Sequence, residues 1–136
     1  MVKRWLIALL VVLTLAATTL ASVVAHAAEK AKTQMIMITP SGISPSTVTV
    51  AKGTKVVWLN NASSTNILFS RGKEVAAASV DPSRFALDSV GRYNSGDIPR
   101  GGIASLSFVG VGKYQYEVVD QQSGGTRIGS GTVIVE

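Results

Sequence analysis

Short runs in which apolar and polar residues alternate dominate the chain from residue 34 onward. A side-chain period of two is the pattern of β-strands that bury one face. Val48 and Val50 share one face of such a run, and Tyr114, Tyr116 and Val118 share one face of another. We therefore predict strands at 34–39, 47–50, 55–60, 67–69, 103–108, 113–119 and 131–135.

Clusters of glycine, proline and serine separate these runs. Examples are Pro40-Ser41-Gly42, Lys52-Gly53, Pro99 to Gly102 and Gly110 to Gly112, and such residues supply the backbone angles that tight turns need. Many short strands joined by frequent turns are typical of an all-β sandwich. We expect a Greek-key β-sandwich of seven to eight strands with one short helical excursion.

The first run, Gln34 to Thr39, is apolar on both faces, which predicts a strand buried inside the sandwich. Its two methionines, Met35 and Met37, stand at alternate positions. We interpret them as core residues rather than as a Cu(I) site, because two thioethers without a third ligand would hold the ion weakly.

The alternation weakens between Ser70 and Arg92. There, Asp81-Pro82 predicts a helix N-cap and a first-turn proline, followed by one or two helical turns that include Leu87. We expect this segment to leave the sheet, either as an element that docks a partner or as a tolerated surface insertion.

The N-terminus has the features of an export signal. Lys3 and Arg4 precede an apolar run that starts at Trp5, and Ala25-His26-Ala27 is an A-x-A cleavage site. This predicts a Sec-type signal peptide at 1–27 and a mature domain at 28–136 that is periplasmic or secreted. The alternative is an uncleaved anchor, since Trp5 to Val24 is about as long as the roughly 20 residues that cross a bilayer, and contact with the membrane would then go through this segment.

The composition excludes several classes of function. The chain has no cysteine, and its single histidine, His26, lies in the predicted signal. The mature domain therefore lacks a Ser-His or Cys-His nucleophile, a histidine base and a zinc site of the usual type, so we do not expect an enzyme. Loss of Lys3 and Arg4 leaves eleven basic and eight acidic residues, a net charge of +3; the cations form no run or stripe, so nucleic acid is not an expected partner.

The acidic residues do not form a calcium motif. No D-x-D-x-D-G spacing occurs, so we interpret them as solvated charges at loops and strand edges. They are Asp81, Asp88, Asp97, Glu117 and Asp120.

Four blocks of sequence resemble the cupredoxins, the plastocyanin and azurin family, over nearly the whole predicted domain. They are I-S-P-S-T-V-T-V-A-K-G-T-K-V-V-W-L-N-N at Ile43 to Asn61, Y-N-S-G-D-I-P-R-G-G at Tyr93 to Gly102, L-S-F-V-G-V-G-K-Y-Q-Y at Leu106 to Tyr116, and the closing G-T-V-I-V. The resemblance implies a cupredoxin fold, with copper-dependent electron transfer as the activity of the family.

The positions that match the copper ligands of the family carry other residues. The first histidine falls on Asn66, the cysteine on Val118 and the second histidine on Gln121, while the loop Gln122 to Ile128, where the methionine is expected, has none. A type 1 site needs a thiolate and two imidazoles. The sequence therefore predicts no cofactor, with Val118 filling the former metal pocket as a core residue.

Two polar loops are the candidate recognition residues, because in the family they meet at one end of the sandwich, and loops on a rigid scaffold commonly carry recognition. Plain turn chemistry explains the same residues equally well. The candidates are Asn61, Ser63, Ser64, Thr65 and Asn66 in one loop, and Asp120, Gln121, Gln122 and Arg127 in the other.

The sequence thus favours an exported cupredoxin-like domain without a copper site, acting as a binding or structural module for an envelope protein or glycan. The alternative is a copper-binding electron-transfer protein of the plastocyanin and azurin type, with an atypical site or a site that a second chain completes.

Overall fold

The computed structural model describes residues 32–136, so the predicted signal peptide at 1–27 and the predicted domain start at residue 28 lie outside the described residues. Within residues 32–136 the chain forms eleven strands and one helix, α2 (Gly72–Ala78). The strands are β1 (Thr33–Thr39), β2 (Gly42–Ser44), β3 (Thr47–Val50), β4 (Thr54–Asn60), β5 (Thr65–Phe69), β6 (Ser79–Ser83), β7 (Ala86–Leu87), β8 (Tyr93–Asn94), β9 (Ile103–Phe108), β10 (Gly112–Asp120) and β11 (Thr126–Val135).

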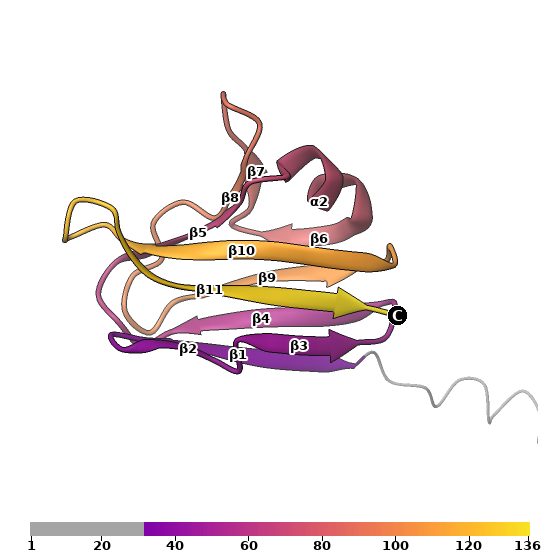
Figure 1. Cartoon of the computed structure of the whole chain (residues 1–136), viewed down its shortest axis with the longest axis horizontal. Coiled ribbons are helices and arrows are strands. Elements are labelled where there is room, and N and C mark those ends of the chain that lie inside the picture. Colours follow the sequence, from indigo (N-terminus) through magenta and orange to yellow (C-terminus); the bar gives the residue numbers. More distant parts are fainter. Residues whose placement is uncertain (1–31) are drawn as a thin grey trace, which may run out of the picture. The chain divides into compact units, whose positions relative to one another are not determined.

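The strands form two sheets (Figure 1). The first sheet has the order β2-β1-β4-β9-β6, and the second has the order β3-β11-β10-β5-β8-β7. β1 pairs in parallel with β4, and β3 in parallel with β11. The all-β sandwich predicted from the sequence is confirmed. The strand count exceeds the expected seven to eight because of short additional strands: β2, β6 and β7 at sheet edges, and β8 between β5 and β7.

Trp58 lies at the centre of the core, as the sequence predicts. Its side chain is completely buried, and its indole makes edge-to-face contacts with the rings of Phe69, Phe85 and Tyr116 at centroid distances of 6.0, 5.6 and 5.4 Å. Such contacts each add about 0.5–1.5 kcal/mol beyond the burial of area. The cluster joins β4 of the first sheet to β5 and β10 of the second.

The phenol of Tyr116 is held in an apolar environment. Its hydroxyl and the Nε1 of Trp58 are both buried, and neither forms a hydrogen bond of normal geometry. Burial raises the pKa of Tyr116 to about 12, and the neighbouring indole N–H of Trp58 opposes only part of that increase. The centre of the core therefore remains uncharged at neutral pH.

The prediction for the first strand is wrong in one respect. β1 forms, but only Ile36 and Ile38 are buried, whereas Met35 and Met37 are 49% and 42% exposed. The methionines are therefore not core residues. In a sandwich of two sheets, each sheet has one face toward the core and one away from it, so an apolar residue at every position of a strand leaves half of them outside.

The prediction of a helix beginning at Asp81-Pro82 is also wrong. The helix is α2, which starts at Gly72, nine residues before Asp81. Lys73, Glu74 and three alanines in it are strong helix formers. Asp81 has a positive φ of 51°, and Pro82 lies in β6, an edge strand, where a missing N–H is tolerated. The segment from 70 to 92 does not leave the sheets either, because it contributes β6 to the first sheet and β7 and β8 to the second.

Gly131 on β11 makes room for the ring of Tyr116. The two residues are directly paired across β10 and β11, and a Cβ at Gly131 would overlap the phenol, with Cε1 only 2.8 Å away. Tyr116 is 1% exposed and packed against Trp58 and Phe69, so its ring has no free space into which it could move.

We expect Gly131→Ala to lower the free energy of unfolding by about 1–3 kcal/mol, the usual cost of overpacking a core. Urea unfolding followed by tryptophan fluorescence measures this change. Gly129→Ala is the matched control on the same strand, since a Cβ there meets only Ile43 at ordinary contact distances of 3.4 Å and more. Equal stability of the two variants would show that the Tyr116 ring is not fixed in this position.

Within residues 32–136, helical structure is nowhere long and apolar enough to cross a membrane.

Candidate functional site

Two loops meet at one end of the sandwich, as predicted from the sequence. The hydroxyl of Ser63 donates a hydrogen bond to Oδ1 of Asp120 at 2.8 Å, and the backbone N–H of Gln121 donates to the carbonyl of Ser64 at 2.9 Å. We call this part of the molecule, formed by residues 61–64 and 120–127, the loop end. Figure 1 shows the β10–β11 loop at the end of the sandwich opposite to the C-terminus.

Asp120 holds the loop end together. Besides the Ser63 hydroxyl, its carboxylate accepts hydrogen bonds from the backbone N–H of Gln122 at 2.9 Å and from the hydroxyl of Ser123 at 3.1 Å. These donors, with Ser63 the largest contributor, hold the pKa of Asp120 below its usual value of 3.8. The carboxylate is therefore ionised at neutral pH and links β10 to both loops.

Asn60, a buried residue at the end of β4, shapes the other loop. Its Nδ2 donates to the carbonyls of Ser63 at 2.6 Å and Ile98 at 2.8 Å, and its Oδ1 accepts from the N–H of Ala62 at 3.0 Å. Both donor hydrogens and the carbonyl oxygen of this amide have partners inside the protein, so Asn60 is a structural residue that supports the loop end.

The three positions matched to copper ligands do not converge. Val118 is completely buried in the core, which confirms the prediction that it fills the interior. Val118 pairs with Ile67, whereas Asn66 pairs with Val119, and because paired residues point to the same side of a sheet, Asn66 faces away from Val118. Gln121 is exposed beyond the strand.

Thr65, one residue before Asn66, is the residue that faces the interior. It is completely buried, and its Oγ1 has no hydrogen-bond partner. Thr65 and Asn66 belong to β5 rather than to a loop, and Thr65 has no exposed surface with which to contact a partner. The interpretation of Thr65 as a recognition residue is therefore wrong, and the strand begins earlier than the polar sequence suggested.

The exposed part of the loop end is polar. Asn61, Gln121, Gln122 and Arg127 are exposed, while Ser63, Ser64, Asn66 and Asp120 are partly buried. A shallow hollow of about 270 Å³ lies beside them, lined by Pro40, Ala62, Ser63, Arg100, Asp120 and Ile128. It combines one cation, one carboxylate and a hydroxyl with apolar walls.

Arg127 does not line this hollow. Its guanidinium forms an ion pair with Glu117 on β10, and both residues line a second hollow of about 230 Å³ on the outer side of β10 and β11. The pair is exposed to solvent on both partners, so its contribution to stability is small. It fixes the position of Arg127 relative to the sheet.

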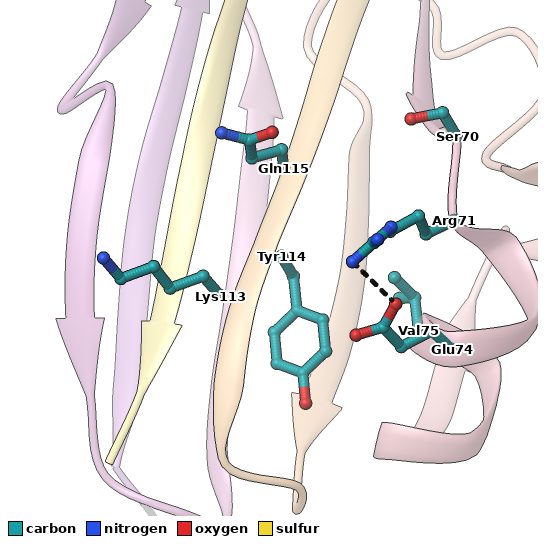
Figure 2. Close-up of a pocket in the computed structure, with 7 residues that line it drawn as sticks. All are labelled: Ser70, Arg71, Glu74, Val75, Lys113, Tyr114 and Gln115. Carbon is teal, nitrogen blue, oxygen red and sulfur yellow. Dashed lines mark ion pairs between the residues drawn. The ribbon is translucent and has the colours of Figure 1, made fainter.

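A third hollow, of about 300 Å³, lies between α2 and β10 and is shown in Figure 2. Arg71 and Glu74 form an ion pair at 3.4 Å on the side of the hollow next to the helix. The ammonium group of Lys113 points away from this ion pair. The hydroxyl of Tyr114 donates to the carbonyl of Gly110 at 2.8 Å, and burial, followed by the charge of Glu74, raises its pKa. Among the residues that line this hollow, no general base contacts a nucleophile. The hollow was not predicted from the sequence.

The hairpin of β7 and β8 is a further feature that the sequence did not indicate. Oδ1 of Asp88 accepts hydrogen bonds from the N–H groups of Val90 and Arg92, and Oδ2 accepts one from Nε of Arg92. This closed turn holds Val90 at 70% exposure. In the sequence this turn is D-S-V-G at Asp88 to Gly91, in the segment where a helix was expected.

No group of three or more histidine, cysteine, aspartate or glutamate residues that could hold a metal ion occurs among residues 32–136. A comparison with protein-family models finds no match, and a comparison with curated proteins finds none either.

Two sheets in this order, with one short helix, form a cupredoxin fold. Among the solved structures with which it superposes are variants of amicyanin: an oxidised proline-to-alanine variant with a TM-score of 0.56 at 18% identity, and a reduced tryptophan-to-tyrosine variant with a TM-score of 0.55 at 17% identity, each over 81% of this chain and 88% of that chain. A methionine-to-leucine variant superposes with a TM-score of 0.53 at 18% identity over 75% and 80% of the two chains. At this level of identity the similarity concerns the fold.

The hydrogen bonds at Asp120 can be tested by titration. We expect Ser63→Ala to raise the pKa of Asp120 toward 3.8, because the variant removes the donor that contributes most to stabilising the carboxylate. NMR titration of the carboxyl carbon measures it. Because the pKa is lowered by folding, the stabilising effect is present at neutral pH and is lost as the pH falls through the lowered value.

Ser64→Ala is the matched control, since Ser64 contributes its backbone carbonyl and no side-chain bond to Asp120. An unchanged pKa of Asp120 in the Ser63→Ala variant would mean that the two loops are not joined through this carboxylate.

Proposed function

We propose that this chain is an exported domain with the cupredoxin fold, without a copper site, that acts as a binding module in the periplasm or at the cell envelope. The observation that carries the proposal is the interior of the loop end. The position matched to the copper cysteine holds Val118, completely buried, and its partner on the neighbouring strand β5 is an isoleucine, Ile67. Hydrocarbon occupies the place where the resemblance requires soft ligands.

The polar groups of the loop end support recognition rather than chemistry. The buried Asn60 and the partly buried Asp120 are used to hold backbone groups, and the described residues contain neither imidazole nor thiol. What remains available is a set of exposed amides and one guanidinium on fixed loops, which can form hydrogen bonds with a partner but cannot activate a nucleophile.

Among the expected partners, we favour an envelope protein over a glycan. Glycan sites commonly stack sugar rings on exposed aromatic side chains, and the three phenylalanines, the three tyrosines and Trp58 are all buried. The same burial removes the aromatic platforms on which single-stranded nucleic acid stacks.

The partner can be sought by crosslinking with the mature chain as bait in an envelope extract of its host. Recognition at the loop end predicts that a variant with Asn61, Gln121, Gln122 and Arg127 replaced by alanine loses a specific crosslinked protein, since these are the candidate recognition residues that the structure leaves exposed. The control variant replaces Lys52, Lys113 and Gln115, which are also exposed but lie outside the loop end. Capture that survives the loop-end substitutions and fails in the control would place recognition elsewhere.

The second candidate function is copper-dependent electron transfer, with an atypical site or one that a second chain completes. It is favoured by the likeness to amicyanin, since several of the similar structures are Cu(I) forms of that protein. The family resemblance in the sequence points in the same direction.

Copper titration separates the two functions. We expect the mature chain to bind neither Cu(I) nor Cu(II) stoichiometrically and to gain no intense blue absorption, because no thiolate is available for the charge-transfer transition. Amicyanin titrated in parallel is the positive control. A tight complex with one copper per chain would establish the second function in place of the first.

A further inference from the structure

Strand β10 has an open edge next to α2. Its pairing with β5 ends at Glu117, which lies opposite Leu68, because the chain turns away after Phe69 and enters the helix. On its other side β10 stays paired with β11 as far as Gly112. Among the described residues, 112–116 therefore have a strand neighbour on one side only. We call this stretch, residues 112–116, the open edge.

Backbone groups of Lys113 and Gln115 point outward from the open edge. The N–H of Thr132, the residue opposite Gln115, donates to the carbonyl of Ser46 at 2.8 Å, on the side of β3. Pairs in an antiparallel ladder alternate between those that exchange hydrogen bonds and those that do not, so Gln115 and Lys113 direct their N–H and C=O groups away from β11. In residues 32–136, no strand pair or turn hydrogen bond reaches these groups on that side. Two donors and two acceptors are thus available to another chain.

The open edge lies along the hollow of about 300 Å³ between α2 and β10 (Figure 2). Lys113, Tyr114 and Gln115 line one wall of this hollow, and Arg71 and Val75 line the other. Because the helix lies on the far side of the hollow, the space next to β10 suits a single extended chain rather than the edge of another sheet. Exposed sheet edges bind extended peptides as an added strand, through main-chain hydrogen bonds.

The side chains along the open edge specify the kind of peptide. In a strand added antiparallel to β10, as β5 is, the residues opposite Gln115 and Lys113 have side chains on the outer face, and the residue between them points into the hollow. There it meets Tyr114 and Val75, which favour a small apolar side chain. Lys113 takes part in none of the ion pairs within residues 32–136, so an acidic residue opposite it forms a cross-strand pair of opposite charge.

A second copy of the chain is a poorer occupant of the open edge. If two open edges paired antiparallel about Tyr114, Lys113 of each copy would lie opposite Gln115 of the other. The two lysines would then be diagonal neighbours on the same face, and like charges across strands are unfavourable. A lysine on a short edge is one of the devices by which proteins prevent the pairing of whole sheets.

We propose that the open edge binds an extended peptide segment of a partner protein as an added strand, with the sequence polar, apolar, acidic from its N-terminus to its C-terminus. The backbone groups of Lys113 and Gln115 provide the hydrogen bonds, and the Lys113 side chain selects the acidic residue. This surface is separate from the loop end, so the proposal depends neither on recognition by the loops nor on the absence of copper.

Amide hydrogen exchange measured by NMR tests the open edge directly. Without peptide, we expect the N–H groups of Lys113 and Gln115 to exchange at least about tenfold faster than those of Tyr114 and Tyr116, which are bonded to β11. The probe is the peptide acetyl-T-V-E-T-amide. At about four times its Kd, exchange at Lys113 and Gln115 is expected to be about fivefold slower, because exchange then requires dissociation of the peptide.

Methylation of the peptide backbone tests whether the peptide binds as a strand. The nitrogen of its glutamate is opposite Lys113 and donates to β10, so its methylation is expected to weaken binding at least about tenfold. The matched control carries the methyl group on the valine nitrogen, which points away from β10, and is expected to bind like the unmodified peptide.

Reversal of charge tests the selection of the acidic residue. We expect Lys113→Glu to weaken binding of the peptide about fivefold, and the peptide acetyl-T-V-K-T-amide to restore it. Lys52→Glu is the matched control, because Lys52 is also an exposed lysine but lies in the turn before β4, and it is expected to leave binding unchanged.

A peptide that leaves exchange at Lys113 and Gln115 unchanged, or that binds equally well with a methylated glutamate nitrogen, would overturn the proposal. Slow exchange at both residues that appears without peptide and increases with protein concentration would assign the open edge to a second copy. The variant with alanine at the four exposed loop-end residues separates this proposal from the proposed function. Retained peptide binding by that variant supports a separate site, whereas loss of binding would place the peptide at the loop end.

Discussion

The packing of Trp58 between the two sheets is the interaction on which the rest of the fold depends. Its ring contacts Phe69 and Tyr116 from the second sheet and Phe85 from the segment that follows α2. Because these partners come from distant parts of the chain, the cluster forms only when both sheets are in place. It also explains why residues 70 to 92 stay with the sandwich, since Phe85 is buried and also stacks on Tyr93 at 5.6 Å.

At the loop end, two polar side chains hold the loops together. Asn60 and Asp120 use side-chain hydrogen bonds to hold both loops, so the backbone that carries the exposed amides is held in place. Beneath them the interior is closed by Val118 and Ile67. A polar rim above an apolar interior is the arrangement on which the proposed recognition role rests.

The sequence predicted the strands well where one face is buried and the other solvated. Runs such as Thr47 to Val50 and Lys113 to Val119 alternate clearly, and their inward residues are the buried ones. It predicted β1 as a strand but not the exposure of Met35 and Met37, because composition does not distinguish an apolar residue facing the core from one facing away. It misplaced the helix, because a proline after an aspartate also fits an edge strand.

For the site, the sequence identified both loops and the two residues, Ser63 and Asp120, that join them. It could not show that Asn66 lies on the outer side of β5 and Thr65 on the inner side, because a shift of one residue reverses the face of every side chain in a strand. That assignment follows from the pairing of β5 with β10.

By itself, the sequence determined the fold class, the central position of Trp58 and the chemical inventory of the chain, since the period of two, the turn residues and the absence of cysteine can be read without coordinates. Only the tertiary structure decided which side chains meet and which remain outside. The register of the strands and the stacking of the two sheets set those neighbours, and both arise from contacts between residues far apart in the chain.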